Sequence, residues 1–116
     1  MSTKPEKHRV SWLTVSQAYS LNVVCRPLAA IGYGTFHVGS SLDNPNYHDV
    51  DLRCMLPDDE YDRMFDSDRG DGFLLFLNAA ISEWISSRTG LPIDFQFQRA
   101  TEANATFTGR RNAVGH

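Results

Sequence analysis

Residues 49–56 read Asp49-Val50-Asp51-Leu52-Arg53-Cys54-Met55-Leu56, and this stretch decides the fold. Apolar and charged side chains alternate at its start, which predicts a β-strand. Side chains two positions apart in a strand point the same way, so Asp49, Asp51 and Arg53 share one face while Val50 and Leu52 face the core. The two carboxylates, on Cα atoms ~6.6 Å apart, can converge on one cation or bridge two. Oxygen ligands of this kind favour Mg²⁺ or Mn²⁺ over zinc.

A second strand is predicted in Pro92-Ile93-Asp94-Phe95-Gln96-Phe97-Gln98, where the alternation is stricter. The apolar residues fall on one face and the polar residues on the other, as in a sheet with one buried face. If the two strands are neighbours, Asp94 lies beside Asp49 and Asp51. Three like charges on one surface destabilise a fold unless a cation binds there, so the pattern predicts a metal site.

A glycine turn precedes both strands. Residues 33–38 predict a strand, and Gly39-Ser40-Ser41 ends it. Gly39 lacks a Cβ atom, which lets the backbone approach a phosphate closely. The two serines offer hydroxyl and amide groups, and a short helix or turn starting here directs free N–H groups at an anion. His37 and His48 either touch a phosphate or shuttle a proton, or they are an ordinary sheet-face histidine and an ordinary loop histidine.

Together these elements resemble the nucleotidyltransferase superfamily. A strand, a Gly-Ser turn, a loop, an Asp-x-Asp strand and a later Asp on a third strand are similar to the small stand-alone or minimal nucleotidyltransferases related to the polymerase-beta catalytic core. The resemblance covers about residues 14–98. It implies that Asp49 and Asp51 bind the metal ions, and that Asp94 helps to bind metal or activates an acceptor hydroxyl. These three are the implied catalytic and metal-binding residues.

The resemblance also implies a nucleotide site. In that family the Gly-Ser turn holds the triphosphate, which implies this role for Gly39 and Ser40. Ser41, His48 and Arg53, which lie beside the turn or the Asp-x-Asp in the sequence, complete the candidate nucleotide-binding residues. Two features depart from the family pattern. The loop before the Asp-x-Asp is shorter and lacks an Ala-Arg-Gly segment, and His48 stands where the family commonly has Ser.

Composition sets the class of protein. A chain of 116 residues with 41% hydrophobic residues is long enough for one domain with its own core. The net charge of −3 gives no reason to expect strong unaided nucleic-acid binding. We expect a cytoplasmic protein without membrane contact, because the chain contains neither an apolar run of transmembrane length nor a signal-peptide segment. Cys25 and Cys54 lie in apolar contexts and are predicted to be buried free thiols.

The helices follow from local signals. Thr14-Val15-Ser16-Gln17 has the form of a capping box, and a helix is predicted from there toward Arg26, ended or kinked by Pro27. Pro57-Asp58-Asp59-Glu60 starts a short helix. The strongest helix spans 73–88 and stops at Gly90 and Pro92. Its core-facing residues are predicted to be Phe73, Phe76, Leu77 and Trp84.

The predicted organisation is one α+β domain with a small mixed sheet and helices packed on one face, similar to a nucleotidyltransferase. Residues 1–13 are expected to form a flexible N-terminal lead-in and 14–98 the domain. The polar segment 99–116 either folds over the site, where its arginines contact phosphate or base, or forms a mobile tail.

Three functions remain open. The first is metal-dependent transfer of a nucleoside monophosphate from an NTP such as ATP to an acceptor hydroxyl on a protein, an RNA end or a small molecule. The second is a weak or inactive nucleotide- and metal-binding module, regulatory or antitoxin-like, which acts through a partner. The third is a structural protein whose acidic face binds nothing. A homo-oligomer or a partner protein that completes the cleft fits the small size of the domain.

Overall fold

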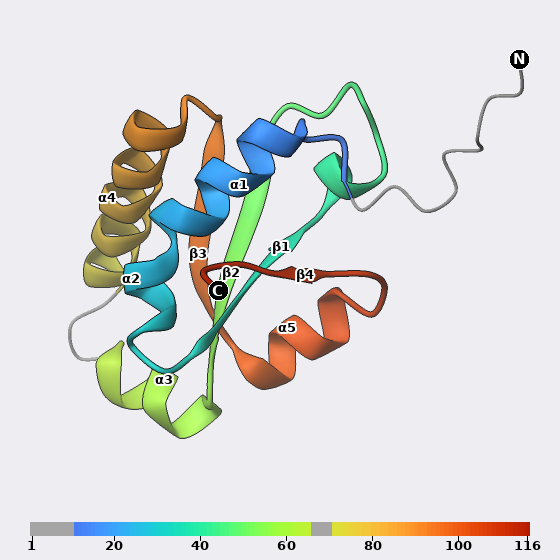
Figure 1. Ribbon diagram of the computed structural model, residues 1–116. Helices are drawn as coiled ribbons and strands as arrows, with labels where there is room; N and C mark the ends of the chain where they lie inside the picture. The colour runs from blue at the N-terminus through green and yellow to red at the C-terminus, as the bar shows by residue number, and fades with distance from the viewer. Residues whose placement is uncertain (1–10, 66–70) are drawn as a thin grey trace, which may run out of the picture.

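The central strand, β2 (Val50–Leu56), has a neighbour on each side in a four-stranded mixed sheet of order β3-β2-β1-β4. The sheet belongs to a computed structural model that describes residues 11–65 and 71–116 (Figure 1). β1 (Gly34–Val38) runs antiparallel to β2, and β3 (Ile93–Arg99) runs parallel to it. β4 (Asn112–Ala113) pairs antiparallel with β1. The predicted α+β class with a small mixed sheet is confirmed.

The pairing register sorts the side chains between the two faces of the sheet. Leu52 is paired with Phe95 in β3 and with His37 in β1, so these three residues lie on one face. Leu52 and Phe95 are fully buried in the main hydrophobic core. Asp51 is paired with Asp94, and this pair lies on the opposite face. The predicted alternation of core and polar residues in both strands is therefore confirmed.

The first helical segment follows the predicted signals. α1 (Val15–Val24) begins after Thr14, whose side chain forms a complete capping box with Gln17. Cys25 separates α1 from α2 (Arg26–Ala29), which has a proline in its first turn. Both cysteines are free and buried, as predicted. Residues 1–10 of the expected lead-in lie outside the described residues, and Leu13 is buried in the main core.

α3 (Asp58–Met64) carries three acidic residues in its first turn, as predicted. α4 (Gly72–Thr89) ends at Gly90, which adopts the left-handed conformation with φ 73°. The buried face of α4 differs from the predicted one. Ile85 is fully buried, and Leu74, Leu77 and Ile81 pack against the core. The predicted packing of Phe73, Phe76 and Trp84 is wrong, because these side chains are 37%, 66% and 36% exposed.

α4 covers the outer edge of β3 with three polar side chains one helical turn apart. Ser86 Oγ, Ser82 Oγ and Asn78 Oδ1 accept hydrogen bonds from the backbone N–H groups of Ile93, Phe95 and Phe97, at 3.2, 2.8 and 3.0 Å. These N–H groups point away from β2, and a buried donor without an acceptor destabilises a fold. The helical spacing i, i+4 and i+8 of Asn78, Ser82 and Ser86 thus supplies one acceptor to every second residue of β3.

The segment after β3 is folded. It forms α5 (Ala100–Thr106) and then β4, which lies beside β1 (Figure 1). α5 contacts β2 and β3. The ring of Phe107, directly after α5, lies 5.9 Å from the Arg53 guanidinium on the polar face. Helices therefore pack on both faces of the sheet and not on one only. No helix among the described residues is long and apolar enough to cross a membrane.

Candidate functional site

The site begins where β1 ends. Gly39 has φ 84° and ψ −163°, a conformation that is essentially restricted to glycine, and Ser40–Leu42 form a 3-10 turn after it. A Cβ atom on Gly39 would lie 2.2 Å from Asp51 Oδ2. The turn predicted from the sequence is present, and the reason for glycine is close contact with Asp51. The turn and the Asp-x-Asp motif are therefore in direct contact.

Asp51 and Asp94 form the acidic centre of the site. They are direct partners across the parallel β2–β3 pair, where neighbouring strands lie ~4.8 Å apart. Burial is the main cause that raises the pKa of Asp51 above its usual value, and the charges of Asp94 and Asp49 raise it further. Arg53 lowers it in part. A cation bound at this pair would offset both the cost of burying the Asp51 charge and the smaller repulsion from the neighbouring carboxylates.

Asp49 and His48 lie on the approach to the site. β2 begins at Val50, so Asp49 belongs to the preceding loop and not to the strand as predicted. Both residues are exposed. The carboxylate of Asp49 is close enough to influence the titration of Asp51. A side chain on a loop can adjust its position more easily than one on a paired strand.

Arg53 is buried and occupied by local partners. Its Nη1 donates to the carbonyl oxygens of Leu52 and Asp94, at 2.9 and 2.8 Å. Its Nη2 lies 3.4 Å from Asp94 Oδ2, and the Arg53 side chain is only 10% exposed. The Arg53 guanidinium therefore partly neutralises the charge of the Asp94 carboxylate and holds Asp94 in position. A role as a surface contact for phosphate would require these hydrogen bonds to change.

The two serines of the turn have different surroundings. Ser40 is exposed beside Gly39, where its hydroxyl and amide can meet a ligand. Ser41 is fully buried, and its Oγ is hydrogen-bonded to Nε2 of His37 at 2.5 Å. Ser41 and His37 thus fix the turn from inside the fold. Burial lowers the pKa of His37 to about 4, so its ring is neutral near pH 7.

The donor set suits a hard cation only in part. Carboxylates on neighbouring strands offer the oxygen ligands that Mg²⁺ accepts. Within residues 11–65 and 71–116, however, no three His, Cys, Asp or Glu side chains are gathered closely enough to hold a metal ion. Asp51 and Asp94 are paired across β2 and β3, whereas Asp49 lies in the loop before β2. Water and nucleotide phosphates commonly supply the remaining ligands of Mg²⁺.

Two residues around the site, Gln96 and Phe107, were not singled out from the sequence as part of it, whereas Arg111 belongs to the C-terminal arginines that were expected to fold over the site or to form a mobile tail. Gln96 Nε2 donates to Asp94 Oδ1 at 3.3 Å. Arg53 contacts the other oxygen of the same carboxylate, Oδ2. Phe107 covers the Arg53 guanidinium, and Arg111 lies 5.1 Å above the Phe36 ring. The alternation in residues 93–98 gave a signal for Gln96. No local signal reveals Phe107, because it reaches the sheet through long-range folding of the C-terminal segment.

No protein-family model, curated protein or solved structure matches the chain. Function is therefore argued from the chemistry of the site.

Proposed function

We propose that the protein transfers a nucleoside monophosphate from an NTP to an acceptor hydroxyl. One observation carries the proposal: Gly39 packs against Asp51, which is paired with Asp94. A turn able to approach phosphate thus adjoins two carboxylates that repel each other without a cation. This combination suits a nucleotide that arrives together with a divalent metal.

Asp51 and Asp94 would hold Mg²⁺ or Mn²⁺, and Asp49 would swing in from its loop. Such a cation would supply positive charge that stabilises the triphosphate and the charge developing on the attacking and leaving oxygens. Gly39 and Ser40 bind the outer phosphates through backbone N–H groups and the serine hydroxyl. Arg53 and Gln96 keep the Asp94 carboxylate in place from both oxygens.

The reaction forms a bond between the acceptor oxygen and the α-phosphorus. The bond between that phosphorus and the oxygen leading to the β-phosphate breaks, and pyrophosphate leaves with its electron pair. Asp94, whose side chain is 39% exposed, orients the acceptor hydroxyl and receives its proton before release to water.

The test is thermal unfolding with each of the four NTPs, with and without Mg²⁺ or Mn²⁺. A nucleotide at about 100 times its Kd should stabilise the fold by ~2.7 kcal/mol, enough to move the midpoint by several degrees. The shift should need the metal and vanish in Asp51→Asn, while Asp59→Asn on the exposed surface of α3 should retain it. A shift that survives Asp51→Asn would assign the nucleotide to another place. Label from the preferred NTP is then followed into protein, RNA and small-molecule acceptors.

A second candidate is a nucleotide- and metal-binding module that acts through a partner without turnover. The pairing of Arg53 with Asp94 favours it, because a carboxylate already neutralised by a guanidinium is a weaker ligand and a weaker base. Metal-dependent NTP stabilisation without label transfer to any acceptor class would support this module over the enzyme.

A further inference from the structure

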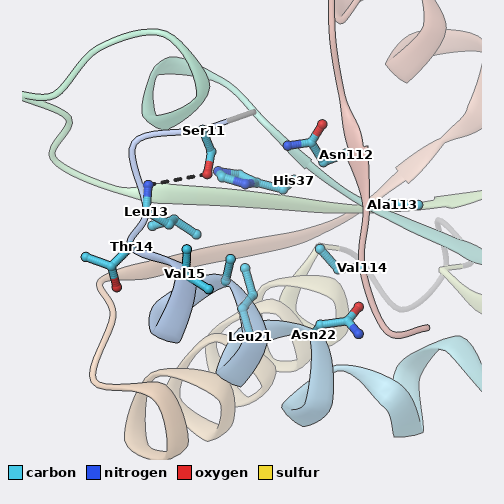
Figure 2. Close-up of a pocket in the computed structure, with 11 residues that line it drawn as sticks. Ser11, Leu13, Thr14, Val15, Leu21, Asn22, His37, Asn112, Ala113 and Val114 are labelled. Carbon is cyan, nitrogen blue, oxygen red and sulfur yellow. Dashed lines mark hydrogen bonds between the residues drawn. The ribbon is translucent and has the colours of Figure 1, made fainter. Parts of the chain in front are cut away.

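A second concave site lies on the face of the sheet opposite Asp51. It is a pocket of about 480 Å³ between α1 and the strands β1 and β4 (Figure 2). His37 belongs to its wall and shares a face with Leu52, whereas Asp51 alternates to the other face. Pockets of 300–1,000 Å³ are the usual size for small-molecule sites. This pocket is thus separate from the acidic centre.

Among residues 11–65 and 71–116, no Asp, Glu, Lys or Arg side chain lines the pocket. Its walls are mostly aliphatic, with neutral polar groups at intervals; the residues are Ser11, Leu13, Thr14, Val15, Ala18, Leu21, Asn22, His37, Asn112, Ala113 and Val114. An ion that entered such a pocket would lose hydration without gaining an opposite charge. His37 is the only ionisable side chain that the described part of the chain contributes to the lining, and it is neutral near pH 7. The pocket therefore selects against charged ligands.

The polar and apolar parts of the lining are separated. Ser11, His37 and Asn112 lie toward one end, and Val15 and Leu21 lie toward the other, where Thr14 and Asn22 add two further neutral polar groups (Figure 2). His37 is only 2% exposed. Its hydrogen bond to Ser41 uses Nε2, which leaves Nδ1 as the ring nitrogen not engaged by Ser41. A hydroxyl group is both donor and acceptor, so it suits Nδ1 in either tautomer of the neutral ring.

We infer that this pocket binds an uncharged, mainly apolar small molecule that carries a hydroxyl group, with the hydroxyl at His37 and the apolar body against α1. The inference is independent of nucleotide binding, since it uses the other face of the sheet. The hydrogen bond from His37 to Ser41 joins the pocket to the turn beside Gly39.

The test uses 2-naphthol as the probe, on the full chain without nucleotide or metal. We expect saturable binding by calorimetry, with amide NMR shifts confined to α1, β1 and β4. Naphthalene-2-sulfonate, which has a similar ring system with a charge, should bind at least tenfold more weakly. Ala18→Trp should fill the pocket and weaken 2-naphthol binding at least tenfold, whereas Ala80→Trp, on the exposed surface of α4, should leave it unchanged.

Ala18 is exposed on a helix, so the larger side chain need not disturb the core. If Ala18→Trp fails to unfold cooperatively, Ala18→Leu replaces it, with at least a threefold weakening expected. Equal affinity for the charged and uncharged probes, equal affinity in the Ala18 variant, or no saturation up to millimolar 2-naphthol would each overturn the inference.

Discussion

Gly39 and Asp51 lie so close together that a single added carbon on Gly39 would come within 2.2 Å of Asp51 Oδ2. The two residues are twelve positions apart in the chain, and the antiparallel pairing of Val38 with Asp51 brings them together. Neither residue can be enlarged without moving the other. The end of β1 and the start of β2 therefore form one structural unit.

Replacing Gly39 with alanine should lower the free energy of unfolding by more than the strained backbone conformation alone would. The positive φ should cost about 1–3 kcal/mol, and the clash with Asp51 adds to this. Gly90→Ala is the control for a positive φ in open space; with ψ 10° against −163° for Gly39, it sets a lower limit on the backbone cost at Gly39. Chemical denaturation measures both variants. Equal losses would show that contact with Asp51 contributes nothing.

The titration of Asp51 predicts a pH dependence of stability in metal-free buffer. Its folded-state pKa is raised, so the folded protein retains a proton that the unfolded chain has released. The free energy of unfolding should thus fall as pH rises from the ordinary aspartate pKa through the raised value. Asp51→Asn should remove this fall and raise the unfolding midpoint at pH 7, whereas Asp59→Asn should not. A parallel pH profile in Asp51→Asn would contradict the prediction.

His37 predicts an effect of the opposite sign. Its folded pKa of about 4 lies below the ordinary value of 6.5, so the unfolded chain binds a proton first as pH falls. Stability should decline between pH 6.5 and pH 4, by roughly 3 kcal/mol if no other group compensates. His37→Gln should flatten this decline. Chemical denaturation at several pH values below 6.5 measures the decline in both proteins. An equal decline in His37→Gln and in the unchanged protein would exclude His37 as its source.

The polar residues of α4 predict a local effect. Ser82→Ala leaves the N–H of Phe95 without its acceptor, which should destabilise the fold by about 1–3 kcal/mol. Hydrogen exchange at that amide should accelerate more than at amides of β1. Ser87→Ala is the control on the same helix, because the Ser87 hydroxyl donates only to the Trp84 carbonyl oxygen at the surface. Similar exchange in the two variants would show that Ser82 does not protect the strand.

The two thiols should be unreactive in the folded protein. Cys25 and Cys54 are fully buried, and burial raises the pKa of Cys25 to about 12. We expect Ellman's reagent to modify neither thiol at pH 8 until denaturant is added, after which both react. Rapid modification without denaturant would indicate that the core opens at equilibrium.

The sequence predicted those parts of the fold that depend on short-range signals. The capping box at Thr14, the stop at Gly90 and the alternation in β2 and β3 each act within a few residues, and all are present. The buried face of α4 was predicted only in part: Leu77 packs against the core as predicted, whereas Phe73, Phe76 and Trp84 are exposed. Its aromatic residues at helical spacing suggested burial, whereas the aliphatic row from Leu74 to Ile85 contacts the core.

In the candidate site, too, some features could be predicted from the sequence and others depend on the tertiary fold. Contact between the turn and Asp51, and the pairing of Asp51 with Asp94, agree with what neighbouring strands would produce. The occupation of Arg53 by Asp94 and of Ser41 by His37 could not be predicted. Each depends on which of several possible polar partners the tertiary fold brings within reach, and residue type alone does not decide that.

The row formed by Asn78, Ser82 and Ser86 has a further consequence. An outer strand normally offers every second N–H group to an incoming peptide, and this is the route by which many sheets recruit partners or aggregate. In this protein an incoming peptide would have to displace three side-chain hydrogen bonds before it gained any of its own. The β3 edge of the sheet is therefore protected against β-augmentation, and a peptide that adds to this sheet would have to use the opposite edge, at β4.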